Sequence, residues 1–422
     1  MLARVIARAL MLAMHFAFLP AFIACVASAV AAPVAVSILP GKGITRGGEP
    51  YFIKGAGGSA HLADLKKAGG NSIRTWSTDG LAAILDAAQK EELSVCAGIW
   101  LEPECAWFSY SNAEHCARQL DRVTKSVREF RDHPALLFWG LGNESEGDGK
   151  NVAYWKQLDA LAVMVHREDP AHPAFTAVAG LQPAKAAGLN AHTPHLDFVG
   201  INTYGALPGL RAHLAEVKWT RPWVVTEYGA QGFWERPKTA WNAPLEQSST
   251  EKAAQLRASY TKAIAPGGDC WGGYVFLWGQ KQEATATWFG LFTAEGESTA
   301  AVDVLTELWS GKPPAGRAPE VTATQLSLTT LNPGQTFTAS AKSTDPDGDP
   351  LTWHWSVAAE SAGRDEKGRE LPPPPVAGAL MKSPAGTAEF RAPDKPGAWR
   401  VFLRVTDGTG RAATANVPFL VK

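Results

Sequence analysis

Apolar and polar residues alternate in blocks along residues 51–309, and the blocks are of two kinds. Short apolar runs of strand length are followed by longer segments whose apolar residues recur every three or four positions, as in a helix with one buried face. Strands that alternate with helices pair in parallel through right-handed crossovers. Eight strands are expected, at residues 51–56, 71–76, 93–101, within 136–147, and at 174–180, 196–205, 223–227 and 270–279.

Helices are expected between these strands, and two of them carry a clear start signal. Ser111-x-x-Glu114 and Ser248-x-x-Glu251 are capping boxes, in which the two side chains satisfy free backbone N–H groups of the first turn. The other helical segments lie at residues 61–68, 81–90, 151–168, 207–217 and 300–309. Eight such units are the number that a closed (β/α)₈ TIM barrel of the α/β class requires.

The pattern changes twice outside the barrel. Residues 33–50 are rich in Pro and Gly and predict a short hairpin, so the barrel domain is expected over residues 33–311. Residues 312–320 are a Pro/Gly-rich linker, and residues 321–422 show short alternating strands with no helical period. This last pattern predicts a C-terminal immunoglobulin-like β-sandwich that resembles polycystic-kidney-type and cadherin-like modules.

The turn DPDGDPL (345–351) in the sandwich has two interpretations. Asp345, Asp347 and Asp349 could hold calcium, or their side chains could bond the backbone of their own turn. Both interpretations stay open at this point.

The first 32 residues are expected to be a signal peptide. Arg4 and Arg8 precede a mostly apolar stretch, and Ala29-Val30-Ala31 provides a small-residue cleavage site. Export to the periplasm or the extracellular space follows, with lipid attachment at Cys25 as an alternative. No other segment is apolar enough to predict a membrane span.

Composition narrows the class of protein. The net charge of −1 argues against nucleic acid as a partner, because proteins that bind nucleic acids carry a basic face. Of the remaining cysteines, Cys105 and Cys116 could form a disulfide across a short loop, and Cys96 and Cys270 are expected to be buried thiols. No zinc-ligand spacing or HExxH motif occurs, so neither a metal nor a cofactor is expected.

Two glutamates stand where apolar strands end. Glu144 follows LLFWGLGN, and Glu227 follows PWVVT. Parallel strands of a barrel present their C-terminal ends on one face, so both side chains are expected at one site. Retaining hydrolysis of a glycosidic bond requires such a pair, about 5–5.5 Å apart, with one acid and one nucleophile.

Residues 45–310 also resemble a known family. EPYFIKGAGG, NSIRTW, FWGLGNESEG, FVGINTYG, VVTEYG and FLWG are similar to the barrel of clan A retaining glycoside hydrolases, especially family 2 glycosidases and fungal β-1,3-glucanosyltransferases. The resemblance implies that Glu144 is the acid/base and Glu227 the nucleophile.

The same resemblance implies the supporting residues. Asn143 would bond the sugar 2-hydroxyl, Arg74 would keep Glu227 ionised, and Tyr204 would orient it. Trp278 would form the stacking floor of the sugar site, and Trp288 would serve an outer subsite. Glu146, which lacks the preceding Asn, is assigned to the loop.

The sequence therefore predicts a secreted retaining β-glycoside hydrolase or transglycosylase that acts on extracellular or cell-envelope poly- or oligosaccharide, with β-glucan as one candidate. Hydrolysis and transfer share the covalent intermediate and differ in whether water or a sugar hydroxyl reaches it. The alternative is a non-catalytic carbohydrate-binding surface protein built on the same barrel.

Overall fold

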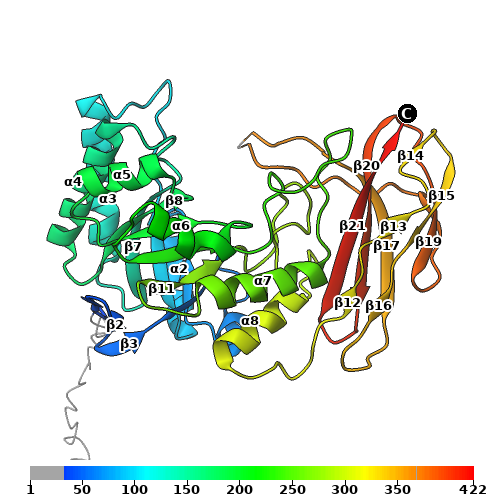
Figure 1. Cartoon of the computed structure of the whole chain (residues 1–422), viewed down its shortest axis with the longest axis horizontal. Coiled ribbons are helices and arrows are strands. Elements are labelled where there is room, and N and C mark those ends of the chain that lie inside the picture. Colours follow the sequence, from blue (N-terminus) through cyan, green and yellow to red (C-terminus); the bar gives the residue numbers. More distant parts are fainter. Residues whose placement is uncertain (1–32, 367) are drawn as a thin grey trace, which may run out of the picture. The chain divides into compact units, whose positions relative to one another are not determined.

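The computed structural model describes residues 33–366 and 368–422. The expected signal peptide and the lipid-attachment alternative at Cys25 lie outside the described residues. The barrel and the sandwich that follows it are parts of one compact unit, and Figure 1 shows their order along the chain.

Eight parallel strands close into a barrel in the order β10-β11-β4-β5-β6-β7-β8-β9. The predicted (β/α)₈ fold is thereby confirmed. The strands are β4 (Ile53–Gly57), β5 (Ser72–Arg74), β6 (Ser94–Ile99), β7 (Leu136–Asn143), β8 (Ala174–Ala179), β9 (Phe198–Asn202), β10 (Trp223–Tyr228) and β11 (Cys270–Val275).

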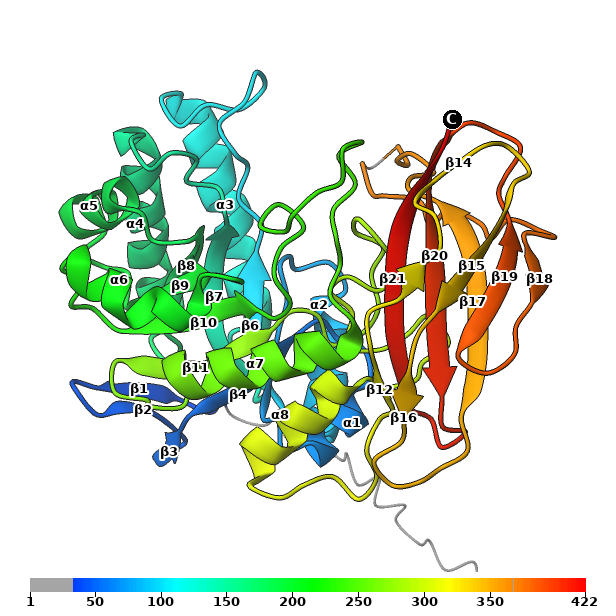
Figure 2. The same ribbon diagram turned by 45° about the vertical axis from the view of Figure 1, so that its right-hand side comes forward.

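The helices lie outside this ring, and most begin where the sequence predicts them. They are α1 (Leu62–Lys67), α2 (Leu81–Lys90), α3 (Ala113–Phe130), α4 (Val152–Glu168), α5 (Pro183–His192), the 3₁₀ turn η2 (Leu207–Gly209), α6 (Leu210–Glu216), α7 (Ser249–Ala263) and α8 (Ala300–Ser310). Figure 2 shows α7 and α8 along the side of the barrel next to the sandwich.

Two details of the helices differ from the prediction. The N-cap of α3 is Asn112 rather than Ser111, because the Asn112 side chain accepts hydrogen bonds from the backbone N–H groups of Glu114 and His115. Helix α5 was not predicted; it begins at Pro183, and no side chain caps it. At α7 the capping box of Ser248 and Glu251 is present as expected.

A small antiparallel sheet precedes the barrel and lies at its N-terminal end. It consists of β1 (Val36–Leu39), β2 (Gly43–Arg46) and β3 (Glu49–Tyr51). Val36 N–H donates to Ala171 O and Arg46 to Pro134 O, two carbonyls just before barrel strands. Aromatic side chains fill the barrel interior near this end, including the stacked rings of Phe175 and Phe198. The opposite, C-terminal end of the barrel is the one left to carry a site.

The C-terminal domain is a β-sandwich, as predicted. Two four-stranded sheets, β13-β15-β19-β18 and β14-β21-β20-β17, enclose a separate apolar core that contains Phe337, Trp355, Phe390 and Phe419. Their bounds are β13 (Gln325–Leu326), β14 (Thr330–Leu331), β15 (Thr336–Ser340), β17 (Thr352–Ala359), β18 (Leu380–Lys382), β19 (Thr387–Arg391), β20 (Gly397–Thr406) and β21 (Ala412–Val421), with a short pair β12 (Glu320–Val321) and β16 (Ser343–Thr344) beside them.

Candidate active site

Four polar residues lie at the C-terminal ends of four barrel strands. Arg74 ends β5, Asn143 ends β7, Asn202 ends β9, and Glu227 is the penultimate residue of β10. Parallel strands bring such positions to one face, and the hydrogen bonds below show that these side chains meet. Gly98 of β6 permits the approach of the neighbouring strand, because a Cβ there would lie 2.3 Å from Thr75 O.

Three donors converge on the carboxylate of Glu227. Arg74 Nη1 donates to Oε1 at 2.9 Å and Trp76 Nε1 to the same oxygen at 2.8 Å. Tyr204 Oη donates to Oε2 at 2.7 Å. Burial, and then the charge of Glu227, raises the pKa of Tyr204 well above its usual value, so the phenol keeps its proton as a donor. Glu227 is thus held by three donors from the ends of two other strands, β5 and β9.

A chain of hydrogen bonds joins Glu227 to Glu144. Arg74 Nη2 donates to Asn143 Oδ1 at 2.7 Å, and Asn202 Nδ2 donates to the same oxygen at 3.1 Å. Asn202 Nδ2 also reaches Glu144 Oε1 at 2.8 Å. Since Asn143 Oδ1 accepts twice, the amide orientation is determined and its Nδ2 remains as a donor for a ligand.

Glu144 has an unusual backbone and an altered acidity. Its φ is 54°, in the left-handed region where non-glycine residues are uncommon. Residues with such strained backbones are found most often at functional sites. The residue as a whole is exposed, but its carboxyl group is largely surrounded by protein, and this burial is the largest cause of its raised pKa. The charges of Glu227 and Glu146 raise the pKa further. A raised pKa keeps a proton available for transfer.

Glu146 lies in the loop after β7, as assigned, but it is buried. Its Oε1 accepts from Lys185 Nζ at 2.6 Å and from Ala179 N–H at 3.0 Å. The buried ion pair of Glu146 and Lys185 therefore fixes the loop that carries Glu144.

An open cleft of about 850 Å³ lies over both glutamates. Its walls carry four aromatic side chains, Trp76, Tyr204, Trp234 and Phe276. Trp234 is 54% exposed, so one ring is available to stack on a ligand. Asn143, Glu144 and Glu227 also line the cleft, and the arrangement offers a proton donor and a fixed carboxylate to one bound molecule.

Five of the seven predicted site residues meet here: Arg74, Asn143, Glu144, Tyr204 and Glu227. The predictions for Trp278 and Trp288 were wrong, because both rings are 1% exposed and neither lines the cleft. Strand β11 ends at Val275, so the chain has already left the sheet at Trp278, whose Nε1 donates to His61 O. Trp288 Nε1 donates to Gln231 O beneath the cleft wall.

Sequence reasoning missed Trp76, Asn202 and Phe276. Asn202 is the last residue of the apolar run FVGIN, and this position at a strand end was a usable signal. Trp76 follows Arg74 at the same strand end. Phe276 offered no signal, since its position depends on where β11 stops.

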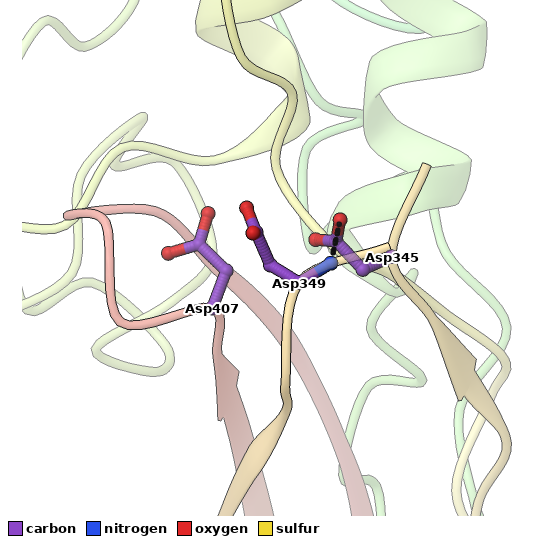
Figure 3. Close-up of side chains that lie close together, drawn as sticks. All are labelled: Asp345, Asp349 and Asp407. Atoms are coloured by element: carbon purple, nitrogen blue, oxygen red, sulfur yellow. Dashed lines mark hydrogen bonds between the residues drawn. The ribbon is translucent and has the colours of Figure 1, made fainter. Parts of the chain in front are cut away.

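The carboxylates that lie together at the aspartate turn of the sandwich differ from the predicted trio, because Asp407, which directly follows β20, takes the place of Asp347. Asp345, Asp349 and Asp407 place a carboxylate oxygen of each within 4.8 Å of the others (Figure 3). Asp347 pairs instead with Arg317 at 3.0 Å. Asp345 Oδ1 accepts from the N–H groups of residues 347 and 349, which is the expected turn role. Calcium binding in this turn stays a prediction.

The four cysteines among the described residues are free. Cys96 and Cys270 are buried, and burial raises the pKa of each thiol to about 12. The Cys105–Cys116 disulfide that the sequence allows is not formed, because Cys116 Sγ donates instead to Tyr110 O at 3.3 Å. Within residues 33–422 no helix has the length and apolar character of a membrane span.

Known proteins share this barrel. Residues 80–256 match the family described as glycosyl hydrolases family 2, TIM barrel domain. The β-glucuronidase of Sus scrofa is 24% identical over 216 residues, which cover 47% of this chain and 32% of that protein. The β-galactosidase of Arthrobacter sp. is 28% identical over 182 residues, which cover 40% of this chain and 17% of that protein.

Solved structures agree at the level of the fold. A calcium-binding mutant of Bacteroides uniformis β-glucuronidase 2 superposes with a TM-score of 0.51 at 16% identity, over 92% of this chain and 47% of that one. The β-D-glucuronidase of Dictyoglomus thermophilum gives 0.52 at 16% identity, over 66% of this chain and 54% of that one. The matched part is about a third of the β-glucuronidase of Sus scrofa. The predicted resemblance of this barrel to the TIM barrel of family 2 glycoside hydrolases is confirmed.

Proposed function

We propose that this protein is a retaining β-glycoside hydrolase with Glu227 as nucleophile and Glu144 as acid/base. One observation carries the proposal: the two glutamates share one cleft and one hydrogen-bond chain, yet their environments differ. Three donors hold Glu227, whereas the pKa of Glu144 is raised by its surroundings. When two carboxyl groups have different environments, one can keep its proton and act as the acid while the other stays ionised and acts as the nucleophile.

The first step would form a glycosyl–enzyme ester. A carboxylate oxygen of Glu227 attacks the anomeric carbon, while the proton of Glu144 passes to the departing glycosidic oxygen. Arg74 and Tyr204 position the attacking carboxylate, and the free Nδ2 of Asn143 donates to the sugar hydroxyl next to the reacting carbon. Such a contact strengthens as the transition state forms.

The second step would release the sugar. Glu144, now a carboxylate, takes a proton from water or from a sugar hydroxyl, whose oxygen attacks the anomeric carbon and frees Glu227. Water gives hydrolysis and a sugar hydroxyl gives transfer. Both outcomes belong to the proposal, with cell-envelope or extracellular poly- or oligosaccharide, β-glucan included, as the substrate class. The relatives named above, a β-glucuronidase and a β-galactosidase, act on β-linked sugars by their names.

The test is product analysis on aryl β-glycosides and β-linked oligosaccharides. We expect shorter products from hydrolysis or longer ones from transfer, and loss of both in Glu227→Gln. The control is Glu129→Gln on the exposed face of α3, which removes the same charge away from the cleft. If the unmodified protein binds these sugars but leaves all of them intact, the carbohydrate-binding alternative replaces the hydrolase.

Azide separates the two roles. With an activated aryl glycoside, Glu227→Ala should accept azide from the face where the carboxylate stood and yield the α-glycosyl azide. Glu144→Ala should still form the ester and release the β-glycosyl azide. The opposite assignment of products would exchange the two roles.

We also propose export to the periplasm or the extracellular space. The basic and apolar start of the chain and the Ala29-Val30-Ala31 site support it. The mass of the mature N-terminus tests it: cleavage after Ala31 gives a new free terminus, cleavage before Cys25 with an added lipid mass indicates anchoring, and an intact Met1 contradicts export.

A further inference from the structure

The charges around the cleft are strongly unequal. Four carboxyl groups line it among the described residues: Glu144, which is the proposed proton donor, and the carboxylates Glu227, Glu235 and Glu283. One ammonium group, that of Lys281, lines it with them. Arg74 is 3% exposed and lies below, where it is committed to Glu227 and Asn143. A molecule that enters this cleft therefore meets a negative wall.

Lys281 is already neutralised. Its Nζ lies 2.6 Å from Glu283 Oε2 and 5.3 Å from the ring centroid of Phe276. An anionic ligand that reached Lys281 would lie beside the carboxylate of Glu283, and the two like charges would repel each other. Glu235 is fixed as well, because its Oε2 accepts from the N–H groups of Gly205 and Gly232.

We infer that the sugar bound at Glu227 is uncharged, and that the Lys281–Glu283 pair together with Glu235 excludes uronic acids. This inference rests on the proposed function and deepens it by naming the substrate class. It separates this chain from the relatives named β-glucuronidase, with which it shares the barrel. A hexose and its uronic acid differ only in the carboxylate at C6, so repulsion from the carboxylates of the cleft would weaken binding of the acid alone.

Matched substrate pairs test the inference. We would measure kcat/KM at pH 7 for 4-nitrophenyl β-D-glucoside against the β-D-glucuronide, and for the β-D-galactoside against the β-D-galacturonide. The neutral member of at least one pair should be favoured by about 100-fold, and higher salt should narrow the ratio. A uronide hydrolysed as fast as its neutral partner would overturn the inference and leave the proposed function standing.

If no glycoside is hydrolysed, the proposed function fails and binding decides the inference. In calorimetry with Glu227→Gln, glucono-δ-lactone should bind at least about tenfold more tightly than glucaro-1,4-lactone, which carries the extra carboxylate. Equal binding, tighter binding of the acid, or no binding of either lactone would overturn it.

Two variants test whether the Lys281–Glu283 pair causes the preference for neutral sugars. Glu283→Gln releases Lys281 and removes one like charge, so the ratio of uronide to neutral kcat/KM should rise about tenfold. Lys281→Gln should lower the same ratio. Glu129→Gln serves as the control and should leave it unchanged, because it removes a carboxylate outside the cleft. A ratio that moves in none of the cleft variants would contradict the role assigned to the pair.

Discussion

The cleft carboxylate Glu227 and the interface carboxylate Glu246 are held in similar ways, each by one cationic side chain and by neutral hydrogen-bond donors. Glu227 accepts from an arginine, an indole and a phenol. Glu246 is buried where the sandwich meets the barrel, and accepts from Lys252, from two threonines and from an asparagine of β21. Each carboxylate therefore has a cation and several neutral donors, so a buried ion pair alone does not mark an active site.

The difference lies in what faces each carboxylate. Glu227 opens onto the cleft and shares it with Glu144, a second carboxyl group of raised pKa on a strained backbone. At Glu246 burial is the largest single influence and raises the pKa, but the charges of Lys252 and Arg400, together with the hydrogen bonds from Lys252 and a threonine, hold the pKa below its usual value. The first cluster is arranged for a ligand, and the second holds two domains together.

The largest expected effect separates the two clusters by activity. Glu227→Gln removes the attacking oxygen, so kcat should fall by at least about 10⁴-fold. Its thermal stability should fall less than that of Glu246→Gln. The reason is that the buried Arg74 keeps Thr226 O and Asn143 Oδ1 as acceptors and that the repulsion between the two cleft glutamates is removed. Initial rates on the best neutral aryl glycoside and a melting curve check both statements. A variant that lost stability and activity in parallel would make Glu227 a structural carboxylate.

Glu246→Gln should show the reverse, a loss of stability of about 3 kcal/mol, because Lys252 would be left buried without its counter-charge. Denaturant unfolding measures it. Adding Lys252→Met to Glu246→Gln should recover part of that loss, because the unpaired charge is removed while the new glutamine can still accept from Thr285, Thr287 or Asn416.

The pH dependence of this stability has a definite sign. A carboxyl group whose folded pKa lies below its unfolded value stabilises the fold above about pH 4.3 and loses that contribution as the pH falls through the folded value. The parent should therefore lose more stability below pH 4 than Glu246→Gln does. If the parent and Glu246→Gln lost equal stability below pH 4, Glu246 would contribute nothing to the acid sensitivity of the fold.

The two clusters also differ in how far the sequence could predict them. Arg74, Asn143 and Glu227 stand at the ends of apolar strands, and a parallel barrel brings such ends together whatever the loops do. Glu246 has no such signal, because its partners Thr285 and Asn416 are distant in the chain and meet it only after both domains fold.

The aromatic side chains were predicted least well. Trp278 was expected at the cleft on the assumption that the eighth strand runs to residue 279, but the strand ends at Val275. A shift of a few residues at a strand end changes which side chains face the ligand, and boundaries are the least certain part of a pattern-based prediction. Phe276 and Trp234 line the cleft instead.

Trp234 gives a smaller effect that sharpens the contrast between exposed and buried tryptophans. Trp234→Ala removes a half-exposed ring from the cleft and should lower kcat/KM about tenfold, mainly through KM, with little loss of stability. Trp278→Ala removes a ring that is packed against Phe292 and Trp309, and should instead cost about 3–5 kcal/mol of folding free energy. Steady-state kinetics and unfolding curves measured on both variants decide between the two roles.

The smallest expected effect concerns the hydrogen bond that joins the two halves of the site. Asn202 Nδ2 donates to Glu144 at 2.8 Å and thereby opposes the rise in the pKa of that carboxyl group. Asn202→Ala removes a donor that favours the charged form, so the pKa of Glu144 should rise further. The alkaline limb of kcat/KM reports loss of the proton from the acid and should move to higher pH. A limb that moves to lower pH, or that persists in Glu144→Gln, would mean that Glu144 is not the group whose proton the reaction uses.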